Sequence, residues 1–229
     1  MIEKAYGSKL RGKLHIKNHM PNQDNYLVYN SKSFTLAVVC DGMGSKKHSR
    51  VGSKRLCKII KKQVKKSLVT GQFNVIDLLT KIQTCWLNKL FPFSLKTCDT
   101  ICLFCIISEN NILSCQLGDG IIAVKTNESV EIIRIKEDDF SNETVGIGRA
   151  KLKDWSIKII KKDSNSNYKI LLGTDGISED LIEEKLLEFI ENISLNTTGK
   201  YYGNKYLTGI LRDWPNKFSN DDKTIVVVK

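Results

Sequence analysis

One apolar run that stops abruptly at an acidic residue dominates the hydrophobic pattern of the chain. Six of the seven residues from Phe34 to Cys40 are apolar, and Asp41 and Gly42 follow at once. An uninterrupted run of this kind is typical of a strand that is buried on both faces. Asp41 is therefore predicted to lie at the end of a rigid strand, where the glycine allows the backbone to turn sharply.

Acidic residues also adjoin three other short apolar runs. These clusters are Gly118-Asp119-Gly120 after residues 112–117, Gly173-Thr174-Asp175-Gly176 after residues 168–172, and Asp221-Asp222 before residues 225–228. A single Asp-Gly pair usually marks only a turn. The recurrence of the pattern is more informative, because carboxylates held at strand ends suit a hard cation. We therefore predict that the four clusters form one shared site.

Helical periodicity predicts the positions of four long helices. They are expected at about residues 50–69, 75–90, 181–193 and 202–211. Pro92 ends the second helix. In the third helix, Leu186, Leu187 and Ile190 are expected to face inward.

The remaining apolar runs predict strands separated by turns. Residues 23–29 form a strand or its approach, residues 100–108, 112–117, 121–125 and 130–135 form an antiparallel meander, and residues 155–161 and 168–172 form a hairpin. Residues 1–20 are interpreted as irregular, and residues 137–154 as a loop. Helices followed by hairpins argue against a doubly wound parallel sheet, so we predict an α+β fold.

Length and composition indicate one domain. A chain of 229 residues fits a single domain, 1–229. It has no apolar run of about eighteen residues that could span a bilayer, and its first ten residues lack the apolar stretch of a signal peptide. We therefore expect a cytoplasmic protein that does not insert into a membrane.

The cysteines are predicted to be reduced core residues. There are seven of them, an odd number, and they lie mostly within apolar runs. Cys102 and Cys105 have the spacing of half a zinc site. In a strand, however, positions three apart point to opposite faces, so these two thiols are not expected to share a metal.

The net charge of +11 raises the question of an acidic partner. Seven of the Lys and Arg residues lie between Lys54 and Lys66. On a helix they fall mainly opposite Leu56, Ile60 and Val64, which favours a solvated face over a core. Since no aromatic residue interleaves with them, as stacking on single strands would require, nucleic acid is not an expected partner.

Five motifs, in order along nearly the whole chain, carry a resemblance to a known family. They are Asn22-Gln23-Asp24, Val39-Cys40-Asp41-Gly42-Met43-Gly44, Leu117-Gly118-Asp119-Gly120, Thr174-Asp175-Gly176 and Asp221-Asp222-Lys223-Thr224. Together they resemble the motifs of the metal-dependent serine/threonine phosphatases of type 2C, the PPM family, and especially its small, single-domain bacterial members. The resemblance implies two packed antiparallel β-sheets flanked by helix pairs, a four-layer α-β-β-α sandwich. The short span from Asp119 to Asp175 implies that the family's flap is reduced.

The resemblance also implies a binuclear centre of two Mn²⁺ or Mg²⁺ ions. Asp41 would contact both ions, Gly42 would offer its carbonyl oxygen to one, and Asp175 and Asp221 would hold the other. Asp24 would orient metal-bound water. The implied catalytic set is thus Asp24, Asp41, Asp175 and Asp221.

A third, weaker metal ion is implied by the family at Asp119. Glu179 or Asp175 would be its further ligand. The alternative for Asp24 and Asp119, argued from the residues alone, is hydrogen bonding within a turn. Gln23 stands where animal members have a glutamate, so its side chain would be only a neutral partner.

Two positions depart from the family pattern. The arginine with which many members grip substrate phosphate is His19 here, so phosphate binding would use His19, Lys17 or Arg50, each of which is otherwise a surface residue. Met43 replaces the histidine proposed as proton donor in animal members, as it commonly does in bacterial ones. Leaving-group protonation is then expected from metal-bound water.

The resemblance implies an enzyme that hydrolyses phosphoserine and phosphothreonine on proteins by a metal-activated water. Its partners would be a phosphorylated protein and a serine/threonine kinase or the targets of that kinase. The alternative is a catalytically degenerate phosphatase fold that acts as a binding module. Against this, Asp41, Asp175 and Asp221 are all retained. Nucleic-acid binding would rest on net charge alone.

Overall fold

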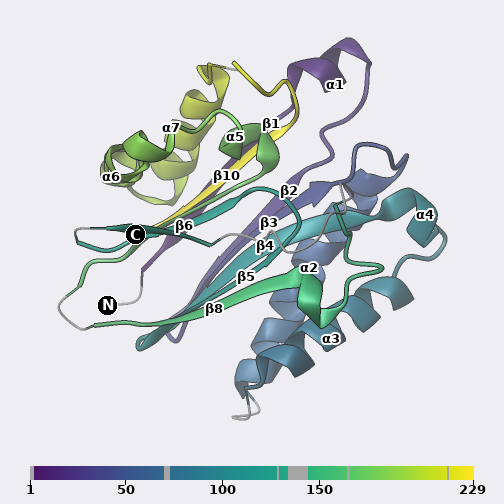
Figure 1. The fold of residues 1–229 in the computed structure, drawn as a ribbon, viewed down its shortest axis with the longest axis horizontal. Helices are drawn as coiled ribbons and strands as arrows, with labels where there is room; N and C mark the ends of the chain where they lie inside the picture. Colours follow the sequence, from purple (N-terminus) through teal and green to yellow (C-terminus); the bar gives the residue numbers. More distant parts are fainter. Residues whose placement is uncertain (1–2, 70–72, 128, 134–143, 164–165, 216) are drawn as a thin grey trace.

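The computed structural model describes residues 3–69, 73–127, 129–133, 144–163, 166–215 and 217–229. In these residues two five-stranded antiparallel sheets lie face to face, with helices on both outer sides (Figure 1). This arrangement confirms the predicted α+β fold of two packed antiparallel sheets flanked by helices.

The first sheet contains the strand that ends at Asp41. Its strands, in spatial order, are β2 (Asn25–Asn30), β3 (Thr35–Gly42), β4 (Thr100–Ile107), β5 (Asn111–Leu117) and β8 (Trp155–Lys161). The strands of the second sheet are β1 (Ala5–Leu10), β10 (Lys223–Val228), β9 (Lys169–Gly173), β6 (Ile121–Lys125) and β7 (Val130–Ile133). The second sheet thus joins the two ends of the described chain, since β1 pairs with β10.

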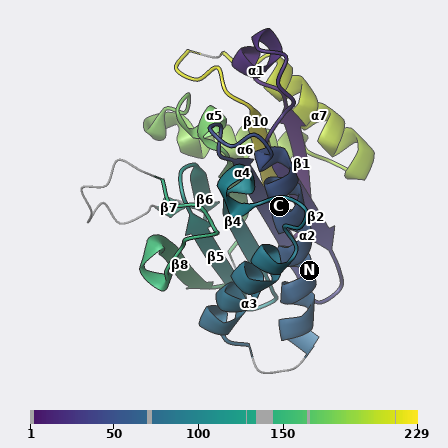
Figure 2. The ribbon, with the colours of Figure 1, turned by 90° about the vertical axis from the view of Figure 1, so that its right-hand side faces the viewer.

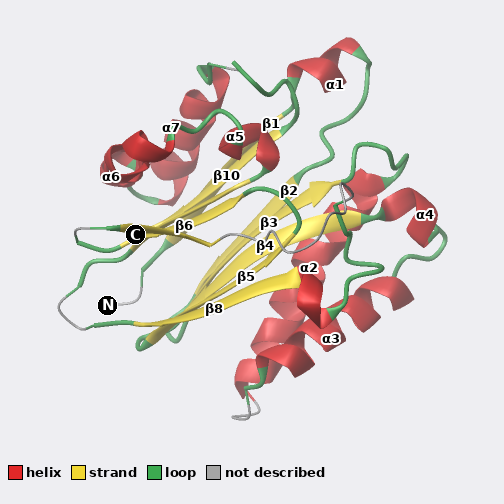
Figure 3. Ribbon diagram, in the orientation of Figure 1, coloured by secondary structure: helices red, strands yellow, loops and turns green. Residues whose placement is uncertain are grey.

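Helices cover the outer face of each sheet (Figures 2 and 3). The long helices are α2 (Ser49–Val69) and α3 (Val75–Asn88) on the first sheet, and α6 (Leu186–Asn196) and α7 (Lys200–Arg212) on the second. The short ones are α1 (Lys13–Lys17), α4 (Leu95–Cys98), α5 (Asp175–Ser178) and the 3-10 turns η1 (Leu152–Asp154) and η2 (Glu183–Lys185). All four helices predicted from periodicity are therefore present.

The core forms three layers because the inner strands of both sheets bury both faces. In β3, Leu36 and Val38 pack toward α2 and α3, whereas Ala37 and Val39 pack between the sheets. A third layer lies between the second sheet and α6 and α7. The prediction of a doubly buried strand at residues 34–40 is thereby confirmed. In each layer, apolar side chains from two facing surfaces, either a sheet and its helices or the two sheets, are buried against each other and away from water.

The cysteine predictions are also confirmed. All seven thiols are free, and six of them are buried. Cys102 belongs to the layer beneath the helices and Cys105 to the layer between the sheets. The two thiols therefore face opposite sides of β4, as the alternation of side chains in a strand requires.

The predicted strand pairing is wrong in two places. β6 pairs with β7 and β9 and not with β5, so the meander of residues 100–135 is divided between two sheets. β8 pairs with β5, and β9 pairs with β6 and β10, so residues 155–161 and 168–172 form no hairpin. Both sheets bury an apolar inner face. An apolar run therefore predicts a strand without indicating to which sheet it belongs.

The beginning of the chain is more regular than predicted. Residues 5–10 form β1 and residues 13–17 form α1, so the expectation of an irregular segment over residues 1–20 is wrong there. The sequence of β1 includes Gly7, Ser8 and Lys9, which give little strand signal. Pairing with β10 stabilises the strand in place of local propensity.

Leu187 was predicted to face inward and does not. It is 41% exposed, while Leu186 and Ile190 are 2% and 0% exposed. The helix begins at Leu186 and not at residue 181, because residues 183–185 form the turn η2. The residues of α6 that are buried against the sheet are Leu186, Ile190, Ile193 and Ser194, and Leu187 lies on the neighbouring, solvated side.

Part of the predicted loop at residues 137–154 lies outside the described residues, as does the end of the strand predicted at 130–135. Residues 144–151 are irregular and lead into η1. The span from Asp119 to Asp175, in which the reduced flap is expected, includes the undescribed residues 128, 134–143 and 164–165.

The strand registers bring the acidic clusters to one end of the sandwich. The last residue of β9 pairs near the start of both β10 and β6. Asp175, Asp221 and Asp119 therefore leave the second sheet at the same end. In the first sheet Asp41 pairs with Ile101, at the start of β4.

Candidate active site

Four of the predicted site carboxylates line one cleft. The cleft has a volume of about 190 Å³ and lies at the ends of β3, β5, β9 and β10. Its lining comprises Asp41, Met43, Gly44, Ser45, Ile101, Asp119, Thr144, Asp175 and Asp221. The four strand-end clusters therefore do meet in one place.

The turn that carries Asp119 depends on its two glycines. Gly118 and Gly120 have φ angles of +83° and +112°, which side chains with a Cβ rarely adopt. A Cβ at Gly120 would also lie 2.6 Å from the carbonyl oxygen of Gly173. Asp119 itself is exposed and accepts a hydrogen bond from Thr144 Oγ1 at 2.5 Å. The turn thus crosses from one sheet to the other and presents a carboxylate to the cleft.

Asp24 lies beneath the cleft and not in its wall. It is 1% exposed. Its Oδ2 accepts hydrogen bonds from Thr224 Oγ1 at 2.8 Å and from Thr174 Oγ1 at 3.0 Å. It also shares a hydrogen bond with Asp41 when that carboxyl group is protonated. Asp24 therefore connects the two sheets directly behind the cleft.

The residues that line the cleft bring four carboxylates together. Burial, followed by the charge of Asp24, raises the pKa of Asp41 well above its usual range. Burial, followed by the charge of Asp221, raises the pKa of Asp175 to about 6. None of the described residues lining the cleft is a lysine, an arginine or a histidine. Oxygen donors in this number and with this charge fit hard divalent cations such as Mg²⁺ and Mn²⁺.

The raised pKa values predict how the metal-free protein responds to pH. A carboxyl group whose pKa is higher in the folded state contributes stability at low pH, and that stability is lost as pH rises through the folded pKa. In EDTA the melting temperature is therefore expected to fall as pH rises from about 4, the ordinary carboxyl pKa, through the value of about 6 for Asp175. Saturating Mn²⁺ should reverse the fall.

Thermal melts at a series of pH values, in EDTA and in Mn²⁺, measure this effect. Asp175→Asn is the control, because it removes one of the repelling charges and should flatten the pH dependence in EDTA. A melting temperature that rises across this window in EDTA would contradict the assignment of repulsion to the cleft.

Comparison with known proteins decides the family. The sequence model of the family described as protein phosphatase 2C matches residues 11–212. This range covers most of the 229 residues and includes Asp24, Asp41, Asp119 and Asp175. The chain belongs to the protein phosphatase 2C family. The resemblance inferred from the five motifs is thereby confirmed.

Solved structures agree with the phosphatase 2C fold. A bacterial serine phosphatase has a TM-score of 0.67 at 18% identity, covering 99% of this chain and 97% of that one. The serine/threonine phosphatase Stp1 from Staphylococcus aureus has a TM-score of 0.66 at 19% identity, covering 100% and 95%. RsbX, solved in complex with magnesium, has a TM-score of 0.63 at 12% identity, covering 99% and 94%. At these identities the likeness establishes the fold. None of the curated proteins compared with the sequence matches it.

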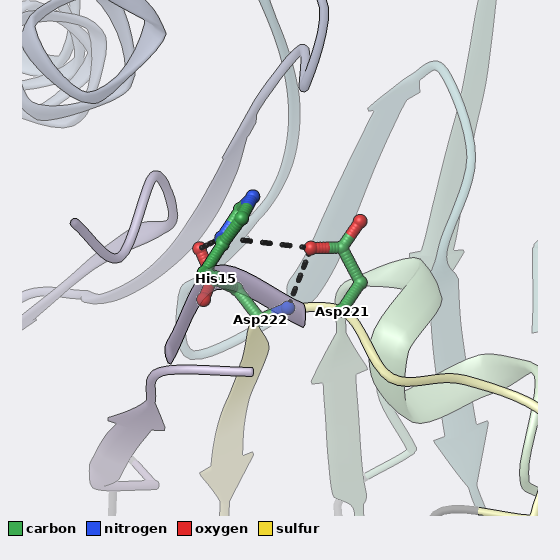
Figure 4. Close-up of side chains that lie close together, drawn as sticks. All are labelled: His15, Asp221 and Asp222. Carbon is green, nitrogen blue, oxygen red and sulfur yellow. Dashed lines mark hydrogen bonds and ion pairs between the residues drawn. The ribbon is translucent and has the colours of Figure 1, made fainter. Parts of the chain in front are cut away.

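The adjacent residues Asp221 and Asp222 of this phosphatase 2C chain have different roles. Asp222 is 1% exposed and points away from the cleft. Its Oδ1 accepts from Gly12 N at 2.7 Å and its Oδ2 from Gln23 N at 2.6 Å. His15 Nδ1 lies 2.8 Å from Asp222 Oδ2 and 3.8 Å from Asp221 Oδ1 (Figure 4).

His15, Asp221 and Asp222 form a poorer cation site than the cleft does. Their ligand atoms lie within 4.8 Å of one another, but both oxygens of Asp222 already accept backbone N–H groups. Such donors leave little room for a cation at the same lone pairs. We interpret His15 and Asp222 as a clasp that fixes the N-terminal segment against residues 221–222.

The predicted phosphate-binding residues lie outside the cleft wall. Lys17, His19 and Arg50 are all exposed, and none of them lines the cleft. Glu179 is also exposed and lies one turn after Asp175, whose carbonyl oxygen accepts its backbone N–H. Its charge contributes to the raised pKa of Asp175, so it lies near the cleft without lining it.

His19 has a conformational role that the sequence did not suggest. Its φ is +53°. The N–H of His19 donates to Ile16 O at 3.2 Å and that of Met20 to His15 O at 2.8 Å, the bonding pattern that ends a helix with one left-handed residue. Glycine usually occupies this position, so its absence hid the end of α1 from sequence reasoning.

Several residues that complete the site were missed. Thr174 and Thr224 lie within the recognised motifs, but their hydrogen bonds to Asp24 were not foreseen. A hydroxyl directly beside an acidic motif is the signal that could have indicated them. Thr144 follows an undescribed segment and His15 lies in a short helix, and no sequence pattern pointed to either.

Proposed function

We propose that this chain is a metal-dependent phosphatase that hydrolyses phosphoserine and phosphothreonine on proteins, with residues 1–229 forming one catalytic domain. The observation that carries the proposal is the cleft of about 190 Å³, where four carboxylates converge with no positive side chain among the described lining residues. Membership of the phosphatase 2C family supports the same reaction. A structural cluster of acids would be expected to include a lysine or arginine.

In this proposal Asp41, Asp175 and Asp221 hold two Mn²⁺ or Mg²⁺ ions together with the backbone carbonyl of Gly42, and Asp119 holds a third, weaker ion. Such ions, when bound, neutralise a phosphate dianion and lower the pKa of a water they share. Asp41 is the best candidate for a ligand that would contact both ions. Its strand β3 lies inside the first sheet, paired with β2 and β4, and Thr100 Oγ1 donates to its carbonyl oxygen, which fixes the end of β3.

Asp24 is proposed to orient the attacking water from behind the cleft wall. Thr174 and Thr224 keep its Oδ2 in place. Its burial, followed by the charge of Asp222, raises its pKa, so it takes up a proton more readily than an ordinary aspartate. Met43, which lines the cleft, has no proton to donate. The proton for the leaving oxygen would then come from water held at the ions.

The substrate is proposed to be a phosphorylated protein, produced by a serine/threonine kinase in the same cell. The seven free thiols are consistent with a reducing compartment, so we place the reaction in the cytoplasm. Among the described residues, no helix has both the length and the apolar character needed to cross a bilayer.

Metal-dependent turnover is the direct test. The purified chain should be offered an aryl phosphate and a phosphothreonine peptide in EDTA, Mg²⁺ or Mn²⁺. We expect turnover of both substrates with metal and none in EDTA. If neither substrate is hydrolysed under any condition while the protein remains folded, the chain is better described as a degenerate phosphatase fold that binds phosphorylated ligands.

Asp119→Ala should give a milder defect than loss of the other carboxylates. Asp119 is exposed at a turn and is held only by Thr144 among the bonds described, so an ion bound there should be weak and should exchange easily. We expect turnover to fall by roughly tenfold at low Mn²⁺ and to recover partly at high Mn²⁺. A defect that is the same at all Mn²⁺ concentrations would indicate a structural role for the turn.

A further inference from the structure

Five positive side chains form a continuous stripe along α2. Arg50, Lys54, Lys58, Lys62 and Lys66 follow one another at intervals of four residues, and all five are exposed. Side chains four residues apart are neighbours on a helix surface. Since a helix rises 1.5 Å per residue, the stripe is about 24 Å long.

The protein does not neutralise this charge. α2 contains eight Lys and Arg residues and no Asp or Glu. No ion pair joins any of the five stripe residues to another part of the chain that the structure describes. Like charges four residues apart destabilise a helix. An arrangement that lowers stability is expected where the charge serves binding.

A basic groove lies along the same helix. Two cavities of about 490 and 400 Å³ share Arg55 and Lys58 in their walls. Six of their nine lining residues are Lys or Arg, and none is acidic. The guanidinium of Arg55 donates to the carbonyl oxygens of Lys89 and Leu90 at 2.6 and 2.7 Å. The segment that contains Lys89, which lines the groove opposite α2, is therefore held to α2 by Arg55.

The groove begins beside the candidate active site. The Cβ of Ser49, the first residue of α2, lies 2.9 Å from where a Cβ on Gly42 would be, and Gly42 follows Asp41. One turn further on, Ser53 Oγ donates to Gln23 O at 2.5 Å. Arg50 is therefore the member of the stripe nearest to the cleft along the helix. The stripe runs away from the cleft from that point.

We propose that this groove binds an acidic segment of the phosphoprotein substrate while the phosphorylated side chain occupies the cleft. The inference rests on the proposed phosphatase activity and specifies its substrate class. An extended peptide spans about 3.3 Å per residue, so the stripe matches a segment of about seven residues. The positive side chains of the stripe are about 6 Å apart, so a carboxylate at about every second position of such a segment would lie opposite one of them. The attraction should lower KM and weaken with salt.

Two features favour an acidic peptide over a nucleic acid. The groove adjoins the cleft where a phosphorylated side chain would be held, so one extended chain can reach both. Its aromatic lining residue, Phe93, lies 5.3 Å from the guanidinium carbon of Arg55 and 4.7 Å from the ring of His48. That ring already packs against two side chains of the protein, and it is the groove's single aromatic lining residue among those described, whereas binding of single strands uses a series of aromatic rings.

The kinetic test compares three phosphothreonine peptides with the full chain in Mn²⁺. One carries a run of glutamates before the phosphothreonine, one carries it after, and one has glutamine in their place. At low salt, we expect kcat/KM for one of the acidic peptides to be about tenfold higher than for the glutamine peptide, chiefly because its KM is lower. In about 0.5 M salt, the two values of kcat/KM should become similar.

Charge reversal in the groove should remove this preference. Lys58→Glu/Lys62→Glu changes two groove residues, and Lys185→Glu/Lys205→Glu makes the same change in net charge at exposed residues beside the second sheet. Only the first variant should lose the preference, while an aryl phosphate, too small to reach the groove, should be hydrolysed equally by all three proteins. Equal kcat/KM for the three peptides with the unmodified chain, or a preference that survives in Lys58→Glu/Lys62→Glu, would overturn the proposal.

A binding measurement separates this proposal from the phosphatase activity. Fluorescence anisotropy of an unphosphorylated glutamate-rich peptide in EDTA should show binding that Lys58→Glu/Lys62→Glu weakens about tenfold. Such binding without metal-dependent turnover would uphold the groove and reject the activity, whereas turnover without binding or preference would reject the groove alone. Tighter binding of duplex DNA than of the peptide, lost in the same variant, would assign the groove to nucleic acid instead.

Discussion

Asp41→Asn is expected to lower kcat by about 10²–10³-fold or more, the range found when one group acting at a reacting centre is removed. Asp41 lies at the end of β3 and lines the cleft. An amide keeps the shape of the side chain and loses its negative charge, so it can offer only one weak oxygen ligand to a cation. Steady-state turnover of an aryl phosphate over a range of Mn²⁺ concentrations measures the effect.

The same substitution should leave the fold intact and raise the stability of the metal-free protein. Burial and the charge of Asp24 raise the pKa of Asp41, so the ionised carboxylate opposes folding when no cation is present. Melting temperatures in EDTA at pH 8 test this expectation. Glu109→Gln, a change of the same kind at an exposed residue in the β4–β5 turn, is the control for both measurements. Near-normal turnover of Asp41→Asn at saturating Mn²⁺ would rule out Asp41 as a metal ligand.

Sequence reasoning located the strands of the site well because local patterns encode them. An apolar run that ends at an aspartate and a glycine predicts both a buried strand and a turn, and β3, β5 and β9 end in this way. Sheet membership is not encoded locally. Gly118-Asp119-Gly120 resembles the tight turn of a hairpin, yet it carries the chain from β5 in one sheet to β6 in the other.

The ligand candidates could be predicted, but their supporting residues could not. Asp41, Asp119, Asp175 and Asp221 lie in motifs, and the structure brings all four to one cleft. The supporting contacts join residues far apart in sequence. Thr224 and Asp24, for example, are separated by 200 positions, and no local pattern relates positions so distant. His15 lies in a five-residue helix that periodicity cannot detect.

The clasp between Asp222 and the N-terminal segment shows what such distant contacts contribute. A Cβ at Gly12 would lie 2.2 Å from the backbone carbon of Asp221, so the two segments approach as closely as their backbones allow. Asp222 then accepts the N–H groups of Gly12 and Gln23 inside the protein. His15, 5% exposed, lies against the same carboxylate.

Asp222→Ala is therefore expected to destabilise the metal-free protein by about 3 kcal/mol or more, because it leaves two buried backbone N–H donors without their acceptor. Asp222→Asn keeps one acceptor oxygen and should cost less than half as much. Urea denaturation in EDTA measures both losses without any contribution from bound metal. His15→Gln serves as the companion variant, since it removes the imidazole and leaves both backbone donors satisfied. If Asp222→Ala were no less stable than His15→Gln, the backbone hydrogen bonds of Asp222 would contribute little, and another contact would have to hold residues 12–23 against the strand that follows Asp221.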